Sequence, residues 1–296
     1  MIKQEISRVF RETLTRISPK LNTRVLYRIK FGKTLDLKNP QTLNEKLLWL
    51  KFNTYWKNPL IKQCADKYKV REYIKKTGCN EILNELLAVY ECVDDIEWEK
   101  LPKQFVIKLN VGCGCNLIVR DKSKLNIVQA KKTLKRWMRK KHYLGYSEMQ
   151  YKDVKPYLLV EKFIKPQNGS LPDDYKFYCF GGKAPYVMMC VDRHDDGHDA
   201  KYLYFNEAWE MQMMSSDAIK YGATLDVPKP DGIDRAFEYA KKLSKDFPFV
   251  RVDLYIVDGN VIFGELTFTP GGAMDQERLP ETDKILGELL DISTLK

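Results

Sequence analysis

The alternation of hydrophobic and polar residues predicts helices in the first part of the chain. Apolar residues recur every three or four positions in residues 2–17, 44–52 and 59–76, which is typical of helices that bury one face. The third pattern ends at Gly78, a residue type that often terminates a helix. We therefore expect a mostly helical N-terminal region over residues 1–100.

The pattern changes beyond this region, where short apolar runs and alternating segments predict strands. Residues 105–110 and 117–119 flank a glycine-containing turn and form an expected hairpin. The continuous apolar run at 157–164 is typical of a buried strand. Further strands are expected at 174–180, 184–191, 249–257 and 261–268, and amphipathic helices at 131–141 and at 231–245, the latter with Ile233, Phe237, Ala240 and Leu243 inward.

The last predicted hairpin carries the clearest chemistry. Its turn, 258–260, reads Asp-Gly-Asn, and because side chains alternate along a strand, Arg251 shares a face with Asp253, and Glu265 with Thr267. Folding the hairpin brings Asp253 near Glu265, and neighbouring carboxylates repel each other. A cation between them relieves the repulsion, and Mg²⁺, which prefers oxygen ligands, suits such a site. The alternative is an exposed polar face of the hairpin.

Two further segments have features that a nucleotide site needs. Lys108 precedes a turn with Gly112 and Gly114, and a lysine beside closely approaching backbone N–H groups can hold phosphates. In the strand 158–164, residues 161–164 interrupt the apolar run just before a loop, which fits a hinge whose backbone binds the edge of a purine. A plain hairpin turn and a simple strand end explain the same residues equally well.

Taken together, these segments resemble the ATP-grasp superfamily, and within it the teichuronopeptide-type ATP-grasp proteins of polysaccharide biosynthesis. The resemblance runs from about Leu43 to Pro270 and rests on the order and spacing of its motifs. It implies an α+β fold in which two α+β subdomains grip ATP. The implied small (lid) subdomain is 101–160 and the implied large subdomain, with the magnesium site, is 161–296. The matching segments are 43–51, 65–74, 105–116, 158–164, 174–183 and 251–270.

The resemblance also implies roles for individual residues in binding ATP. Two lysines would contact its phosphates, two glycines would belong to a flexible flap above them, and a four-residue hinge would hold adenine. One aspartate is the candidate for the ribose. These residues are Lys67 and Lys108, Gly112 and Gly114, Glu161, Lys162, Phe163 and Ile164, and Asp174.

The implied reaction needs a second group of residues. Arg251 would stabilise the transferring phosphoryl group, and Lys176 would face the phosphate or the substrate. Lys201 stands in a segment, 199–203, that resembles the loop of D-alanine ligase-type enzymes whose lysine reaches the γ-phosphate. The implied metal contacts are Asp253, Glu265 and Thr267, the last standing where many ATP-grasp enzymes have asparagine.

The implied function is an ATP- and Mg²⁺-dependent carboxylate-amine ligase that forms an amide through an acyl phosphate. Its expected partners are ATP, an amino acid and a saccharide containing a uronic acid, in a capsular or other cell-surface polysaccharide. The alternative is a glycosyltransferase of polysaccharide biosynthesis. The adjacent acidic pairs at 94–95 and 195–196 give that alternative weak support.

The net charge of +10, from 50 basic and 40 acidic residues, resolves into two patches. Residues 1–33 hold nine basic and two acidic residues, and residues 120–142 hold ten and one, so the rest of the chain is mildly acidic. The helix at 2–17 either packs on the body by its apolar face or lies on an anionic membrane surface. The second patch is either a solvated face or a contact for an anionic substrate or membrane. No nucleic-acid partner is expected, because the net charge is the only feature that points to one and no recognised nucleic-acid-binding motif accompanies it.

The cysteines and the hydropathy indicate an intracellular protein. The seven cysteines are scattered and odd in number, so reduced thiols are expected. No apolar run approaches the roughly 18–20 residues that a membrane span needs. The expected location is the cytoplasm, and a lipid-linked substrate would bring the protein to the inner face of the membrane through its basic N-terminal helix.

Overall fold

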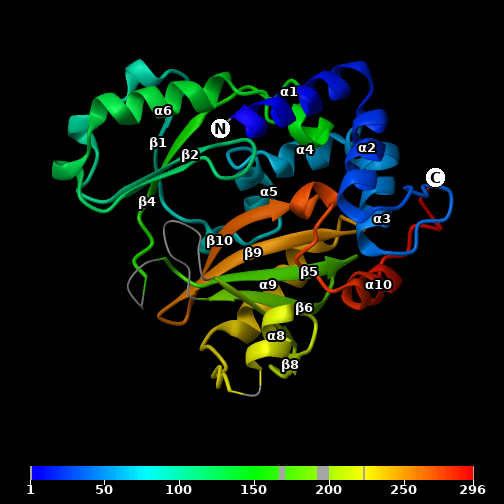
Figure 1. The fold of residues 1–296 in the computed structure, drawn as a ribbon. Helices are drawn as coiled ribbons and strands as arrows, with labels where there is room; N and C mark the ends of the chain where they lie inside the picture. The colour runs from blue at the N-terminus through cyan, green and yellow to red at the C-terminus, as the bar shows by residue number, and fades with distance from the viewer. Residues whose placement is uncertain (1, 167–170, 192–199, 223, 296) are drawn as a thin grey trace.

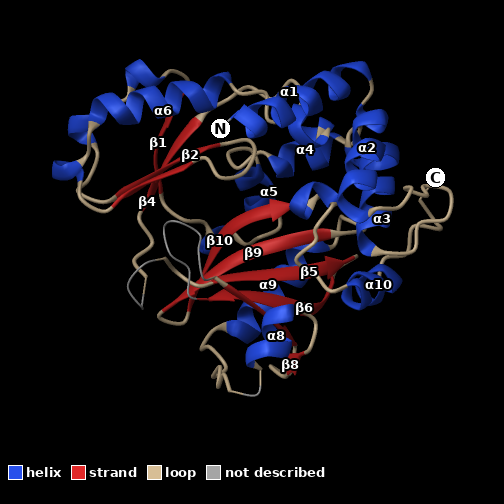
Figure 2. Cartoon of the chain, in the orientation of Figure 1, coloured by secondary structure: helices blue, strands red, loops and turns tan. Residues whose placement is uncertain are grey.

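Two antiparallel sheets, one of four strands and one of six, face each other in the computed structural model of the chain (Figure 1). The structure describes residues 2–166, 171–191, 200–222 and 224–295. The strand order is β1-β4-β2-β3 in the smaller sheet and β10-β9-β5-β6-β7-β8 in the larger one. Most helices gather beside the sheets, while α6 lies over the smaller sheet (Figure 2).

The elements have the following bounds. The helices are α1 (Ile2–Ile17), α2 (Pro19–Phe31), α3 (Leu43–Leu50), α4 (Pro59–Ala65), α5 (Val70–Lys76), α6 (Ile127–Arg139), α7 (Tyr143–Tyr146), α8 (Ser216–Tyr221), α9 (Ile233–Ser244) and α10 (Pro280–Glu288). The strands are β1 (Leu86–Tyr90), β2 (Phe105–Leu109), β3 (Asn116–Val119), β4 (Leu158–Lys162), β5 (Asp174–Phe180), β6 (Lys183–Val191), β7 (Lys201–Asn206), β8 (Met211–Gln212), β9 (Val250–Val257) and β10 (Asn260–Thr267).

The smaller sheet confirms the hairpin expected around residues 111–116, because β2 pairs with β3. Its central strands are β2 and β4, and α6 packs on it through the fully buried Leu134. The sheet extends beyond the segment 101–160, since β1 comes from the N-terminal region and β4 ends at Lys162. The N-terminal helices α2 to α5 share their buried core with the larger sheet.

The expectation of one helix over residues 59–76 is wrong, because the chain forms α4 and α5 with a break at Asp66. The Asp66 carboxylate accepts hydrogen bonds from the backbone N–H groups of Tyr68 and Lys69, at 2.8 and 3.2 Å. Such local bonds compete with the helix, and hydrophobic periodicity does not reveal them. The break turns Lys67 toward the space between the two sheets.

The larger sheet has one face covered by α9 and the other turned toward the smaller sheet (Figure 1). The residues of α9 expected to face inward are buried, which confirms that prediction. The Phe177 ring meets the Phe237 ring of α9 with 4.9 Å between centroids. Because neighbours in a strand point to opposite faces, Lys176 of β5 points away from α9, toward the smaller sheet.

A bulge in β10 decides which residues face the smaller sheet. The register pairs Phe263 with Leu254 and then Glu265 with Asp253, so Gly264 has no partner in the ladder. A methyl group on Gly264 would lie 2.8 Å from the Asp253 carbonyl oxygen, so the backbone approaches too closely for any other residue. The buried positions of β10 therefore switch from Val261 and Phe263 to Leu266.

The N-terminal helix α1 does not pack by its apolar face. Its contact with the body is made by Thr15, which is buried and donates a 2.7 Å hydrogen bond to the Leu144 carbonyl oxygen. Thr15 also shares hydrogen bonds of 2.8 Å with Ser147 and Asn22. The expectation of a helix packed through its apolar side is therefore wrong. Across the part of the chain that the structure describes, no helix combines the length and hydropathy needed to cross a bilayer.

Candidate active site

The hairpin of β9 and β10 brings an arginine, two carboxylates and a hydroxyl together at the face of the larger sheet. The register pairs Glu265 with Asp253 and Thr267 with Arg251, so the expected juxtaposition is confirmed. The guanidinium of Arg251 donates two hydrogen bonds to Asp253, of 2.7 and 2.6 Å, and lies 3.9 Å from Glu265. The cation that separates the two carboxylates therefore comes from the chain itself.

Two lysines complete this cluster from other elements. Lys67, at the break between α4 and α5, lies 3.1 Å from Glu265 and donates a 2.7 Å hydrogen bond to the Gly112 carbonyl oxygen. Lys176 of β5 lies between Asp174, with which it forms a short ion pair, and Asp253 at 3.2 Å. The predicted residues Lys67, Asp174, Lys176, Arg251, Asp253, Glu265 and Thr267 thus form one network.

The two carboxylates of the cluster differ in their pKa. Burial alone would raise the pKa of Glu265, but Lys67 and Arg251 outweigh burial and hold that pKa at about 2. At Asp253 burial outweighs Arg251 and Lys176 and raises the pKa above its ordinary value. The Glu265 side chain is also the more accessible, with 32% exposed against 4% for Asp253. Glu265 is therefore the carboxylate best placed to meet a ligand.

The donor set fits Mg²⁺, which binds proteins through one or two carboxylates and takes its other ligands from water and phosphate. Asp253 and Glu265 are paired in register, and the Thr267 hydroxyl lies 3.3 Å from Glu265. Within the described ranges no three His, Cys, Asp or Glu side chains converge as a metal site. The chain thus offers two acidic ligands here. The other coordination positions of Mg²⁺ remain for water and phosphate oxygens.

A cavity of about 320 Å³ lies between the smaller sheet and the Tyr255 side chain of β9. In it, Lys108 and Glu161 form a 2.8 Å ion pair, and Arg71 lies 3.7 Å from the same carboxylate. The size falls within the range of small-molecule sites. Six of the nine residues predicted for the nucleotide or its flap line it: Lys108, Gly114, Glu161, Lys162, Phe163 and Ile164. Of the other three, Lys67 and Asp174 belong to the neighbouring cluster, and Gly112 does not line this cavity.

The sequence reasoning missed Tyr255, which lines this cavity, and Arg71, which pairs with its Glu161. Tyr255 follows Arg251 and Asp253 on the same face of β9, so the alternation that found those two residues also indicates Tyr255. Arg71 comes from α5, and its guanidinium also donates a 2.8 Å hydrogen bond to the Asn84 carbonyl oxygen. Nothing in its local sequence indicates that position.

The turn between β2 and β3 joins the nucleotide cavity to the carboxylate cluster. Gly112 and Gly114 have φ angles of 75° and 71°, which are unfavourable for other residues. Gly112 lies directly against the His142 ring, whereas nothing lies within 4 Å of the position of a methyl group at Gly114. The two expected flap glycines therefore differ, since Gly112 is held by packing and Gly114 lines the open cavity.

A second cavity, of about 340 Å³, adjoins the cluster on the side away from the nucleotide cavity. It shares Arg251, Glu265 and Thr267 with the cluster and adds Glu148, which accepts a 2.7 Å hydrogen bond from the Thr269 hydroxyl. Burial raises the pKa of Glu148. The sequence reasoning did not single out this carboxylate, because it lies in a short irregular segment with no recognisable motif.

Within the described part of the chain, the remaining candidate residues lie away from the site. Lys201 opens β7 with its Nζ 5.4 Å from the Tyr221 ring, and it lines neither of the two cavities described above. The first residue of its motif, Asp199, belongs to residues 192–199, which lie outside the described part of the chain. Asp94 forms exposed ion pairs with Lys135 and Lys131, at 2.8 and 3.9 Å, and the pair 195–196 also lies outside the described residues.

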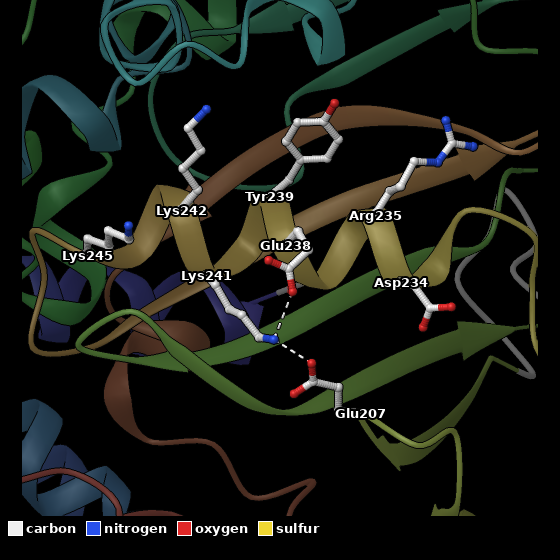
Figure 3. Close-up of a pocket in the computed structure, with 8 residues that line it drawn as sticks. All are labelled: Glu207, Asp234, Arg235, Glu238, Tyr239, Lys241, Lys242 and Lys245. Atoms are coloured by element: carbon white, nitrogen blue, oxygen red, sulfur yellow. Dashed lines mark hydrogen bonds and ion pairs between the residues drawn. The ribbon is translucent and has the colours of Figure 1, made fainter.

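A shallow hollow over the outer side of α9 holds acidic and basic side chains (Figure 3). Those of α9 point outward from the helix, and Lys241 pairs with Glu207 of the loop between β7 and β8 and, at 2.9 Å, with Glu238. The helix covers the sheet face opposite the carboxylate cluster. This hollow is therefore a solvated surface with neighbouring charges balanced, separate from the site.

Comparison with known families decides which proteins this chain resembles. A model of the TupA-like ATP-grasp family matches residues 45–291. The chain belongs to the TupA-like ATP-grasp family. This membership confirms the expected ATP-grasp fold, with helices and antiparallel sheets in an α+β arrangement. A comparison with curated proteins found no match.

Solved structures similar to this TupA-like protein include amino-acid ligases. The D-alanine–D-alanine ligase of Bacillus anthracis in complex with ATP is 18% identical, with a TM-score of 0.48 over 78% of this chain and 64% of that one. An L-amino acid ligase from Bacillus licheniformis is 14% identical, with a TM-score of 0.44 over 72% of this chain and 44% of that one. The TupA-like chain thus spans less than two thirds of the length of either enzyme.

Proposed function

We propose that this protein is an ATP- and Mg²⁺-dependent carboxylate-amine ligase that releases ADP. One observation carries the proposal: the cluster of Arg251, Asp253, Glu265 and Lys67 lies between two cavities. One cavity has the size and polar groups that a nucleotide needs, and the other is free for a second substrate. In this proposal the smaller sheet, expected at 101–160, is the lid, and the larger sheet, expected in 161–296, carries the metal site.

The proposed reaction has two steps. The γ-phosphoryl group passes from ATP to a carboxylate and gives ADP and an acyl phosphate; an amine then displaces phosphate and forms the amide. Bound at Glu265 and Asp253, Mg²⁺ would neutralise charge on the phosphates and orient them. Arg251, Lys67 and Lys176 would stabilise the charge on the transferring group, each worth about 3 kcal/mol by analogy with single oxyanion donors.

The remaining residues would position the nucleotide. Lys108 would contact the phosphates, and the backbone N–H groups of Gly112 and Gly114 would approach them. Glu161, Lys162, Phe163 and Ile164 would form the adenine hinge, and Asp174 would bind the ribose. Lys201 would reach the γ-phosphate if its segment of β7 moved toward the cluster.

We propose an amino acid and a saccharide containing a uronic acid as the substrates. The cavity beside Glu148 supports this pair, because it has carboxylates for an ammonium group and, in Lys30 and Arg251, cations for a carboxylate. The resemblance to proteins of capsular and cell-surface polysaccharide biosynthesis supports the saccharide. A lipid-linked saccharide would place the enzyme in the cytoplasm at the inner face of the membrane.

The test is nucleotide release from ATP and Mg²⁺ with a panel of uronic acids and amino acids. We expect ADP, with a loss of about 10²-fold or more in Asp253→Asn and Glu265→Gln, and no loss in Glu238→Gln on the outer side of α9. Release of AMP and pyrophosphate would indicate adenylation instead. Binding of a UDP-sugar in preference to ATP would favour the glycosyltransferase.

A further inference from the structure

The helix α1 presents its apolar residues to the outside of the molecule. Ile6, Val9, Phe10 and Ile17 have exposed fractions of 64%, 51%, 48% and 69%. Ile6, Phe10 and Ile17 follow each other at spacings of four and seven residues, so they share one side of the helix. Thr15, nine positions from Ile6, lies about two and a half turns along and therefore on the opposite side, where it binds the body. This is the reverse of ordinary amphipathic packing.

The charge around this apolar face is predominantly positive. Between residues 6 and 33, Glu12 is the one acidic residue, and it pairs within α1 with Arg8 and Arg16, at 3.2 and 3.9 Å. The next helix continues the surface with the exposed arginines Arg24 and Arg28. It also exposes Leu21 and Ile29, at 42% and 67%. The outer sides of α1 and α2 thus expose both apolar and cationic side chains.

The second basic patch adjoins this surface. The helix α6, which carries half of the basic residues of that patch, ends at Arg139, and α7 begins four residues later. Leu144 of α7 and the following Ser147 contact Thr15 of α1. In Figure 1, α1 and α6 lie along the same upper edge of the molecule. The helices that carry the two patches therefore lie at the same edge of the molecule.

We propose that the outer side of α1 and α2 docks on an anionic lipid surface. Exposed apolar residues would enter the boundary between head groups and acyl chains, and the surrounding arginines and lysines would bind the head groups. A protein partner would need acidic residues spread over its whole contact surface, whereas an anionic bilayer presents negatively charged head groups everywhere. The inference does not depend on the ligase chemistry, because the surface contains no residue of the site.

The test is sedimentation of the full chain with vesicles of phosphatidylcholine, with and without phosphatidylglycerol. We expect binding to the anionic vesicles, little binding to the neutral ones, and release at high salt. Ile6→Ser/Phe10→Ser and Arg24→Glu/Arg28→Glu should each lower binding at least about tenfold. The matched controls are Ile219→Ser, whose side chain is 62% exposed on α8, and Lys183→Glu/Lys284→Glu.

Thermal unfolding and ATP binding of every variant separate this proposal from the proposed function. All substituted side chains are exposed, so the unfolding midpoints and ATP binding should match the wild type. Absence of binding to anionic vesicles would overturn the docking proposal, and so would equal loss in the controls. Dissociation of a dimer in Ile6→Ser/Phe10→Ser, without an effect on vesicles, would show that a second copy covers the face.

Discussion

Glu265 shows how strongly single side chains set the properties of the site. It is the more accessible carboxylate of the cluster, and its pKa of about 2 reflects Lys67 and Arg251 acting against burial. A group whose pKa is lower in the folded than in the unfolded state stabilises the fold above its unfolded pKa. That stabilisation is lost as the pH falls through the folded pKa, here between about 4.5 and about 2.

Lys67→Met should weaken this pH dependence of the folding stability. Without the ammonium group, the pKa of Glu265 moves back toward its ordinary value, so less stability remains to be lost between pH 4.5 and pH 2. At neutral pH the variant should be less stable by about 1 kcal/mol. Urea unfolding at a series of pH values checks this, with the exposed Lys183→Met as control. An unchanged pH dependence would show that Lys67 does not hold Glu265 ionised.

The sequence predicts residues that lie on regular strands better than those that do not. Alternation places Arg251, Asp253 and Glu265 together, and the same rule extends to Tyr255. Glu148 lies outside any regular element, so no periodicity indicates it. The sequence predicts Mg²⁺ between the two carboxylates, whereas in the structure the Arg251 guanidinium lies between them. That contact depends on the rotamer of a long side chain, which a pattern of residue types does not specify.

At the scale of elements, the turn between β2 and β3 depends on two glycines that are not equivalent. Gly112→Ala adds a methyl group 2.7 Å from Cγ of the His142 ring, whereas Gly114→Ala adds one to open space. Both positions have positive φ, which costs an alanine about 1–2 kcal/mol. We expect Gly112→Ala to lower both stability and ATP affinity more than Gly114→Ala. Thermal unfolding and ATP titration of the two variants measure the difference.

His142, which supports this turn, should make it sensitive to acid. Burial, with Lys140, lowers the pKa of His142 to about 4. The unfolded chain therefore takes up the proton first, and stability falls as the pH drops from about 6.5 to about 4, then levels off. Because the ring is partly exposed, we expect a loss of about 1–2 kcal/mol. His142→Asn should remove this part of the pH dependence of stability, as measured by urea unfolding. An equal loss of stability over the same pH range in the variant would contradict the assignment to His142.

Element boundaries show what sequence periodicity leaves out. The helices and strands around the site lie close to where they are expected, because their apolar faces are regular. The helix break at Asp66 and the bulge at Gly264 are not visible in the periodicity, since each depends on a local backbone contact. Both irregularities position site residues, Lys67 in one case and Glu265 in the other.

At the scale of the whole molecule, the two sheets face each other across the nucleotide cavity. A ligand that binds both sheets stabilises the folded chain by mass action, by about 2.7 kcal/mol at a hundredfold excess over Kd. We therefore expect ATP with Mg²⁺ to raise the unfolding midpoint by about 5 °C or more. Lys108→Met should reduce the rise, and the exposed Lys132→Met should not. An equal rise in both variants would place ATP outside this cavity.

The bulge at Gly264 has a consequence for changes in chain length. The strand β10 contains one residue more than strict alternation needs, so a deletion of Gly264 would leave Phe263 facing the core and Glu265 facing the cleft. A deletion of Leu266, two residues later, would instead turn Thr267 into the core. Shortening is thus tolerable at one position of this strand and disruptive two positions later, although both deletions remove a single residue.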